Sequence, residues 1–215
     1  YRCAYFLTTT TRLKLFAILC VVVLCGFFIL RDSTPKGLCP LNGDSIITLG
    51  DSLANGFGVS ENDSFAIQIP RILGKSAIKL GIDGEVSAGL MARISSELDG
   101  KNPAVVIISI GGNDFLRKLD KSVAQRNIET IVRKAKAKTS CVVLLGVPDG
   151  ILGGLVGGVS SVYYDIAKAE GVLLEKDAMP QILKQHSLKV DEIHPNKDGH
   201  TIIAQNIAEL IKKAK

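Results

Sequence analysis

The 215-residue sequence has no tryptophan, and aromatic residues make up only 5% of it. No run of basic residues is interleaved with these aromatics, and the formal net charge of +5 is spread over lysines in helix-like segments. Proteins that bind nucleic acids usually carry such a run or a concentrated basic face. The composition therefore does not support nucleic-acid binding, and we expect no nucleic-acid partner.

The cysteines show no metal-binding or redox pattern. No CxxC pair is present, and no cysteine stands at metal-ligand spacing. Cys3, Cys20 and Cys25 lie in or before an apolar N-terminal run, which leaves Cys39 and Cys141 as the only later pair. A disulfide between these two is allowed by the pattern but not implied by it. We expect Cys141, inside the apolar stretch "CVVLLG", to be a small buried hydrophobic residue.

Charge is missing from residues 15–30, "LFAILCVVVLCGFFIL", which follow Arg2, Arg12 and Lys14. An uncharged run of this length after a basic segment is typical of a membrane-targeting segment. No small-x-small cleavage site follows it, and no lipobox precedes a cysteine. We predict an inner-membrane anchor over residues 1–31, with the rest of the chain in the periplasm or outside. Alternatives are a cleaved signal peptide, which would give a secreted protein, and a buried core helix.

A polar linker over residues 32–44 precedes a predicted single domain over residues 45–215. Four short stretches of this domain are apolar on both faces, as buried parallel strands are: "SIITLG", "AVVIISIG", "CVVLLGV" and, less strongly, "SAIKLG". Longer segments between them have apolar residues at helical spacing: "SFAIQIPRIL", "GLMARISSEL", "VAQRNIETIVRKAKA", "VYYDIAKAEG" and "HTIIAQNIAELIKKA". The alternation predicts a three-layer α/β/α domain with a central parallel sheet and an active site at the carboxyl ends of its strands.

The stretch "ITLGDSLANGFGV", residues 47–59, places a serine directly after the first predicted strand. Ser52 would lie where the strand ends and the free backbone N–H groups of a helix begin, a suitable position for a nucleophile. The glycines around it let the backbone turn and let a substrate come close. Gly-Asp-Ser is equally common in ordinary turns, so this motif alone leaves both interpretations open.

The C-terminal stretch "DEIHPNKDGH" contains an acid and a histidine three residues apart. This spacing predicts that Asp191 and His194 meet on one helical turn, with the carboxylate on one imidazole nitrogen and a serine facing the other. Pro195 suits the first position of the last helix. The sequence therefore predicts a catalytic triad of Ser52, Asp191 and His194, in this chain order.

A metal site formed by Asp191, His194 and His200 is the competing hypothesis. No other cluster of acidic residues or histidines completes such a site, and we expect no metal. His186 lies in the polar stretch "LKQHSLK" and His200 at the start of the last helix. We expect both of these histidines to face solvent or to cap a helix.

A third stretch, "ISIGGNDFL", ends another predicted strand with Asn113 on a glycine turn. A serine that attacks an ester creates an oxyanion, which needs hydrogen-bond donors fixed in advance. The Asn113 carboxamide, the backbone N–H of Ser52 and the N–H of a nearby glycine would supply them. An asparagine in such a position more often forms a turn than donates a hydrogen bond to a substrate. Together with Ser52 and the Asp191–His194 pair, however, Asn113 favours a common site where three strand ends converge.

These motifs together resemble those of the SGNH or GDSL family of serine hydrolases, especially its bacterial thioesterase, lysophospholipase and arylesterase branch. The resemblance runs from about Ser45 to the C-terminus. "GDSLANGFG" matches the nucleophile block, "GIDGEVSAGLMARI" the glycine block, "SIGGNDFLR" the asparagine block and "DEIHPN" the Asp-x-x-His block, in the family's order. Val86 departs from this pattern, because the branch usually has threonine there, which affects the hydrogen bonding of that loop.

The resemblance implies a flavodoxin-like fold and a role for each residue. Ser52 would be the nucleophile, His194 the general base and Asp191 the residue that orients it, while Gly84 and Asn113 would join the Ser52 amide in the oxyanion hole. The implied activity is cofactor-free hydrolysis of acyl esters, lysophospholipids or acyl-CoA. Alternatives are an acyltransferase or deacetylase acting on a carbohydrate, and a membrane-tethered binding domain without turnover.

The glycine-rich stretch "DGILGGLVGGVSSVYY", residues 149–164, follows the strand "CVVLLGV" and should emerge at the same sheet edge as the motifs. Its apolar side chains predict a wall of an acyl pocket. The residues concerned are Ile151, Leu152, Leu155 and Val156. The alternative is an N-terminal extension of the next helix, packed on the sheet.

Overall fold

The structure, a computed structural model, describes residues 38–150 and 157–215, which belong to one compact unit, Pro35–Lys215. The predicted anchor over residues 1–31 lies outside the described residues, as do residues 151–156. No helix within the described ranges combines the length and hydropathy needed to cross a bilayer.

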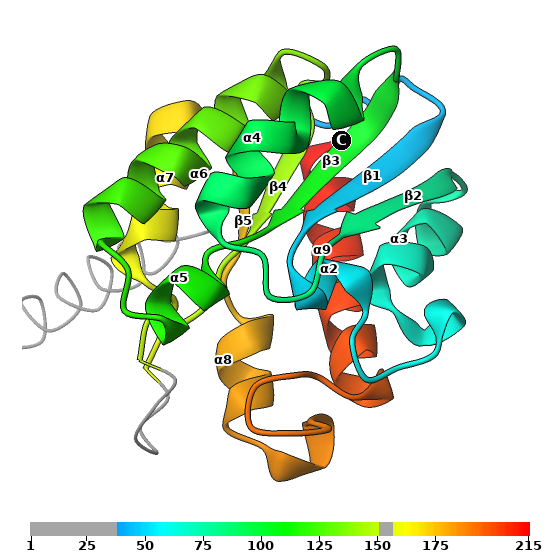
Figure 1. Ribbon diagram of the computed structural model, residues 1–215. Helices are drawn as coiled ribbons and strands as arrows, with labels where there is room; N and C mark the ends of the chain where they lie inside the picture. The colour runs from blue at the N-terminus through cyan, green and yellow to red at the C-terminus, as the bar shows by residue number, and fades with distance from the viewer. Residues whose placement is uncertain (1–37, 151–156) are drawn as a thin grey trace, which may run out of the picture. The chain divides into compact units, whose positions relative to one another are not determined.

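A sheet of five parallel strands forms the centre of the domain (Figure 1). The strand order is β2-β1-β3-β4-β5, which is the flavodoxin-like order. This confirms the predicted three-layer α/β/α fold and the four predicted strands. A fifth strand, β5, was not predicted, because its three residues are too short for a recognisable pattern. The strands are β1 (Ser45–Gly50), β2 (Ser76–Gly81), β3 (Pro103–Ser109), β4 (Val142–Leu145) and β5 (Leu173–Glu175).

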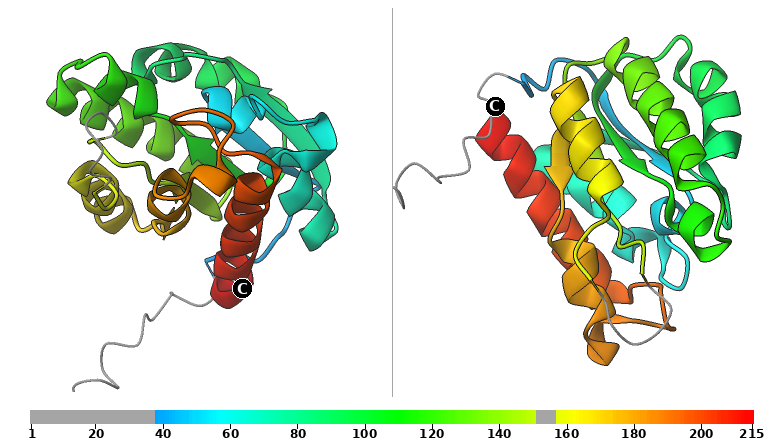
Figure 2. Two further views of the ribbon diagram at one scale, coloured as in Figure 1. Left: turned by 90° about the horizontal axis from the view of Figure 1, so that it is seen from below. Right: turned by 90° about the vertical axis from the view of Figure 1, so that its left-hand side faces the viewer.

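Five long helices cover the two faces of the sheet, and they correspond to the five predicted segments (Figures 1 and 2). One face is covered by α4 (Ser87–Leu98), α6 (Lys121–Lys136) and α7 (Ser161–Glu170), and the other by α3 (Phe65–Leu73) and α9 (Lys197–Ala214). Short elements gather at the end of the sheet where the strands finish. They are α2 (Ser52–Asn55), α5 (Gly112–Leu116), α8 (Ala178–Leu183) and the 3₁₀ turns η1 (Glu61–Asp63) and η2 (His186–Leu188).

The central strands β1, β3 and β4 are buried along their whole length, which explains their continuous apolar sequences. The helices add their apolar faces to the same core; Ile131 of α6 and Ile207 of α9, for example, are fully buried. Burying a side chain of this size contributes about 1.5–3 kcal/mol. The sheet is therefore a rigid base for the loops at its carboxyl end. The edge strand β2 is only half-buried, so its sequence pattern is weaker.

Cys39 and Cys141 form a disulfide, with their Cα atoms 4.5 Å apart. The expectation that Cys141 is simply a small buried hydrophobic residue was therefore wrong, although both cysteines are fully buried. The bond joins the residue before β4 to Cys39, whose N–H also donates to the carbonyl of Ala214 at the end of α9. It closes a loop with a sequence separation of 102. By chain entropy, closing a loop of this length stabilises the folded state by about 4.7 kcal/mol.

Candidate active site

Ser52 is the first residue of α2, directly after β1, as the sequence predicts. Gly50 has a φ of 145°, and a Cβ there would lie 1.7 Å from the carbonyl oxygen of Ser109 on β3. Only glycine fits this close approach of two strand ends. The Asp51 side chain caps α2 by accepting from the Leu53 N–H at 3.1 Å. As the first residue of the helix, Ser52 has an N–H without a partner inside that helix.

Ser52, His194 and Asp191 form a hydrogen-bonded series. Ser52 Oγ lies 3.0 Å from His194 Nε2, and His194 Nδ1 lies 2.7 Å from Asp191 Oδ2. A proton on Nδ1 donates to the carboxylate, which leaves Nε2 free to accept the proton of the serine hydroxyl. This is the arrangement that activates a serine as a nucleophile.

The Asp191 carboxylate is also held by the backbone. Its Oδ1 accepts from the N–H groups of Ile193 at 2.9 Å and His194 at 2.8 Å. Burial alone would raise the pKa of Asp191, but the hydrogen bonds from the Ile193 N–H, the His194 ring and the His194 N–H outweigh it and lower the pKa below its ordinary value. The carboxylate is therefore ionised at neutral pH, as its role beside an imidazole requires.

The local backbone around Asp191 and His194 differs from the prediction. The pair does not lie on a helical turn but in a loop, where the Val190 N–H donates to the His194 carbonyl at 3.0 Å. Pro195 forms an isolated antiparallel bridge with Lys189 and does not begin a helix. Helix α9 begins two residues later, with Asn196 as its N-cap. A turn closed by the aspartate's own hydrogen bonds gives the same side-chain contact as a helical turn, so the spacing could not distinguish the two.

Asn113 lies in α5, after a turn that requires glycine. Gly111 has a φ of 112°, and a Cβ there would lie 2.6 Å from the hydroxyl of Tyr163. Asn113 Nδ2 donates to the carbonyl of Glu85 at 3.1 Å. One amide proton is used by this bond, and the second is free for another acceptor. Asn113 also lines the same cavity as Ser52 and His194, so the structure brings these three predicted residues together.

Gly84 lies in the turn between β2 and α4, with a left-handed φ of 72°. It precedes Glu85, the partner of Asn113, and its own carbonyl accepts from Arg117 Nη2 at 2.7 Å. Gly84 does not belong to the lining of the cavity that contains Ser52. The turn that contains Gly84 therefore lies beside the Asn113 amide, which lines the cavity, whereas Gly84 itself does not line it.

The cavity at Ser52 has a volume of about 360 Å³, including its open mouth, and its wall is mostly apolar. It lies between the elements that follow β1, β3 and β4 and the loop that carries His194. The predicted pocket residues Ile151, Leu152, Leu155 and Val156 fall on residues that the structure does not describe. The lining residues are Asp51, Ser52, Leu53, Gly112, Asn113, Leu116, Val147, Met179, Ile193 and His194.

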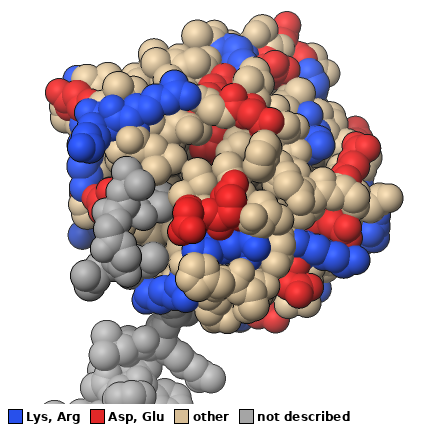
Figure 3. Space-filling model, turned by 60° about the horizontal axis from the view of Figure 1, so that its bottom comes forward, with Lys and Arg blue, Asp and Glu red and all other residues tan. Residues whose placement is uncertain are grey.

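Charged groups around this end of the domain are mixed in sign. Figure 3 shows both acidic and basic side chains on this face, separated by uncharged ones over most of its area. Inside the cavity wall, burial raises the pKa of Asp51 to about 7, although the hydrogen bond from the Leu53 N–H partly offsets this. Asp51 thus carries a proton over part of the neutral range, directly beside Ser52.

Phe57 is a site residue that the sequence analysis did not identify. Its ring centroid lies 4.4 Å from that of His194, and the two rings are tilted by 39°. Phe57 as a whole is 43% exposed, and its ring lies against the imidazole, which restricts the orientation of the imidazole ring. The only sequence signal was an aromatic residue in the stretch "GDSLANGFG", and this signal carries no information about its partner.

His200 does not join Asp191 and His194 at a metal site. Its ring is fully buried and stacks on Phe65, and its Nδ1 accepts from the Phe65 N–H at 3.3 Å. The expectation that His200 faces solvent was wrong, because it points inward from α9. It does cap a helix, since the N–H that it accepts is that of Phe65, the first residue of α3. His186 is exposed as expected. Within residues 38–150 and 157–215, no group of three or more histidines, cysteines or acidic residues is arranged to hold a metal ion.

The buried His200 predicts a loss of stability in acid. Burial, followed by the nearby His194 charge, lowers its pKa from 6.5 to about 4. Between these two values the unfolded chain binds a proton that the folded chain does not, so stability falls as the pH falls from about 6.5 to about 4. We expect this group to account for about 3 kcal/mol of that loss.

Urea unfolding of the wild type and of His200→Gln at pH 7 and pH 4 measures this effect. Glutamine keeps a hydrogen-bond acceptor but does not titrate. The variant should therefore lose less unfolding free energy between the two pH values than the wild type does. An equal loss in both proteins would show that His200 is not the titrating group.

Comparison with known proteins gives consistent results. The sequence model described as "GDSL-like Lipase/Acylhydrolase family" matches residues 48–202. The "Esterase TesA" of Pseudomonas aeruginosa is 27% identical over 180 residues, which cover 78% of this chain and 88% of that protein. The "Thioesterase 1/protease 1/lysophospholipase L1" of Escherichia coli K12 is 27% identical over 178 residues, which cover 79% of this chain and 84% of that protein.

A solved structure, "Crystal Structure of TesA", superimposes on this chain with a TM-score of 0.70. The two chains are 24% identical, and the match covers 80% of this chain and 100% of the other. At this level of identity the superposition supports the fold, in agreement with the strand order described above.

Proposed function

This chain belongs to the GDSL-like lipase/acylhydrolase family, and we propose that it is a serine hydrolase that cleaves carboxylic ester and thioester bonds. The observation that carries the proposal is the hydrogen-bonded series from Ser52 through His194 to Asp191, at the wall of an apolar cavity. The curated relatives are named as an esterase and as a thioesterase and lysophospholipase, which supports the same chemistry. We assign this activity to the domain over residues 45–215.

The proposed reaction has two stages. Ser52 Oγ attacks the acyl carbonyl while His194 Nε2 takes the hydroxyl proton, and the alcohol or thiol leaves with a proton returned by His194. Water then enters, gives a proton to the same imidazole and releases the acid from the acyl-enzyme. Asp191 stays ionised and stabilises the imidazolium that forms in each stage. The steps use side chains and backbone only and require no cofactor.

The charge that develops on the carbonyl oxygen needs donors. We propose that the Ser52 N–H, the Gly84 N–H and the free proton of the Asn113 amide supply them. The position of Asn113 at the cavity wall supports its part in this hole, and the glycine turn beside it supports the part of Gly84. An apolar cavity favours the acyl part of the substrate, which suits acyl esters, lysophospholipids or acyl-CoA.

A panel of substrates tests the proposal. The purified protein is offered p-nitrophenyl esters from acetate to palmitate, acyl-CoAs of the same lengths and lysophospholipids, and release of the alcohol or thiol is followed. We expect turnover of esters and thioesters with acyl chains longer than acetyl. A non-catalytic binding domain would turn over none of them, and a carbohydrate deacetylase would accept only the acetyl compounds.

Replacement of Asn113 by alanine is expected to lower kcat by about 100-fold, since one oxyanion donor contributes roughly this much. The change in KM should be smaller, because the donor acts on charge that appears mainly in the transition state. Steady-state kinetics on the best ester measures both values. Asn62→Ala, at an exposed asparagine that pairs with Arg71, is the matched control and should change neither. An effect on KM alone would make Asn113 a substrate-binding residue.

We also propose an extracytoplasmic location for this domain. Disulfides persist in oxidising compartments, and the buried bond between Cys39 and Cys141 supports such a location. Attachment to the inner membrane through residues 1–31 stays a prediction from the sequence. Cell fractionation with antibodies to the domain is expected to find it in the membrane fraction, with both cysteines oxidised. Recovery as a reduced protein in the cytoplasm would contradict the proposal.

A further inference from the structure

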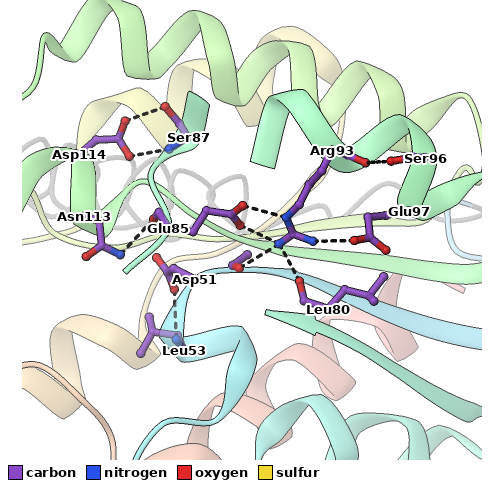
Figure 4. Close-up of polar contacts among 11 residues, drawn as sticks. Asp51, Leu53, Leu80, Glu85, Ser87, Arg93, Ser96, Glu97, Asn113 and Asp114 are labelled. Carbon is purple, nitrogen blue, oxygen red and sulfur yellow. Dashed lines mark hydrogen bonds and ion pairs between the residues drawn. The ribbon is translucent and has the colours of Figure 1, made fainter. Parts of the chain in front are cut away.

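Arg93 on α4 holds the carboxylate of Glu85 by two hydrogen bonds, although it lies outside the cavity. Nε donates to Oε1 at 2.8 Å and Nη2 to Oε2 at 2.7 Å (Figure 4). The side chains are 17% and 8% exposed, respectively. A two-point contact of this kind fixes direction as well as distance, because the guanidinium group is planar and rigid.

The same guanidinium group also contacts the ends of two strands. Its Nη2 donates to the carbonyl of Leu80 on β2 at 2.8 Å and approaches the carbonyl of Gly50 on β1 at 3.4 Å. Gly50 is two residues before Ser52. Arg93 therefore links the strand that carries the nucleophile, the neighbouring strand and the turn that contains Glu85. A fourth partner is Glu97, which accepts from Nη1 at 3.2 Å and lies on α4 like Arg93 itself.

The backbone of Glu85 is the partner of Asn113. Its carbonyl accepts from Asn113 Nδ2 at 3.1 Å, and this bond determines where the other amide proton points (Figure 4). The Glu85 side chain and backbone thus connect Arg93 to Asn113 through two successive contacts. Gly84, whose N–H we assign to the oxyanion hole, is the preceding residue of the same turn.

A buried carboxylate fixes the other end of this turn. Asp114 accepts from the Ser87 N–H at 2.8 Å and from the Ser87 hydroxyl at 2.6 Å, and Asn127 donates to that hydroxyl at 3.0 Å. Asp114 is adjacent to Asn113 in the chain, so α5 and the turn are tied together there too. With this end fixed independently of Arg93, loss of Arg93 should shift Glu85 without unfolding the whole turn.

We propose that Arg93 is a positioning residue for the oxyanion hole, which it organises by holding Glu85 so that Asn113 presents its free amide proton to the cavity. The inference rests on the proposed hydrolase function. Preorganised donors stabilise a transition state only at the correct position, and a displacement of about 1 Å can lower the rate by about 100-fold. Arg93 itself touches neither the substrate nor the reacting atoms.

The test is a double-mutant cycle between positions 93 and 113 in the full-length chain. Arg93→Gln removes both the charge and the two parallel N–H donors that hold the Glu85 carboxylate. Arg93→Lys keeps the charge but offers a single ammonium group in place of the two donors. Each is made alone and with Asn113→Ala, and kcat, KM and the melting temperature are measured with one ester. Glu97→Gln is the matched control, because Glu97 contacts Arg93 but makes no hydrogen bond of its own to the turn that contains Glu85.

We expect Arg93→Gln to lower kcat by about 10- to 100-fold and to leave KM within about twofold. Arg93→Lys should change kcat in the same direction, and Glu97→Gln should leave it unchanged. In the Asn113→Ala background, the loss caused by either Arg93 variant should shrink to less than about threefold, because Arg93 acts through Asn113. If Arg93→Gln does not fold, the loss of kcat caused by Arg93→Lys is compared with and without Asn113→Ala instead.

Two results would overturn the inference. One is an unchanged kcat in folded Arg93 variants, even with a lowered melting temperature, which indicates a purely structural ion pair. The other is the same fold-loss with and without Asn113, which shows that the two residues act independently. Failure of the proposed function looks different, because the wild-type protein would then hydrolyse no ester in the panel.

Discussion

Ser52→Ala is expected to lower ester hydrolysis by about 10⁴- to 10⁶-fold, the range found when a triad nucleophile is removed. The substitution deletes the Oγ that lies 3.0 Å from His194 Nε2, and without this atom no acyl-enzyme can form. The fold should survive, because the deleted hydroxyl makes its side-chain contact to His194 and supports no element of the core. Release of p-nitrophenol from an acyl ester measures the rate, and circular dichroism measures the melting temperature.

Ser122→Ala is the matched control for this experiment. Ser122 is an exposed serine on α6 whose hydroxyl donates to Asp120, and it does not line the cavity that contains Ser52. This variant should keep the wild-type rate. A folded Ser52→Ala variant with a near-normal rate would rule out Ser52 as the nucleophile.

His194→Ala should cause a loss of the same order, about 10⁴-fold or more, because the proton of Ser52 then has no acceptor. Adding His194→Ala to the Ser52→Ala variant should lower the rate little further, since nucleophile and base act as a unit. Steady-state kinetics of the two single variants and the Ser52→Ala/His194→Ala variant measures this. Losses that multiply in the double variant would show that His194 does not act on Ser52.

The other two histidines are internal controls with different expected results. His186 is exposed, and His186→Ala should change neither rate nor stability. His200 is buried against Phe65, so His200→Ala should lower the melting temperature while the folded fraction keeps its rate. An activity loss in folded His200→Ala equal to that of His194→Ala would point to a different base.

The fold was largely predictable from the sequence because its main elements have strong patterns. The strands β1, β3 and β4 are buried on both faces and read as continuous apolar runs, and α6 and α9 show regular amphipathic spacing. The short elements β5 and α8 were missed because three to six residues give too few repeats to establish a period. Tertiary contacts hold them in place: β5 pairs with β4 at the edge of the sheet, and α8 packs against α9.

The candidate site was predictable where a residue type in a recognisable position carries the chemistry. Ser52 and Asn113 were predicted from their place after a strand, and Asp191 and His194 from their spacing. The structure places Ser52, Asn113 and His194 at one cavity, with Asp191 hydrogen-bonded to His194. The contacts of Phe57 and Arg93 were not predictable, because they depend on side-chain direction between segments far apart in the sequence. The disulfide was left open for the same reason, since its formation requires two Cα atoms 4.5 Å apart that the sequence separates by 102 residues.

The central claim is that Ser52 carries the acyl group, and mass spectrometry after reaction with an alkyl p-nitrophenyl phosphonate tests it most directly. Attack by Ser52 Oγ forms an oxygen–phosphorus bond and expels p-nitrophenolate, which leaves a stable adduct. We predict one phosphonyl group per chain, on the peptide that contains Ser52, and none in Ser52→Ala. An adduct on another residue, or full esterase activity after Ser52 has been modified, would contradict the assignment.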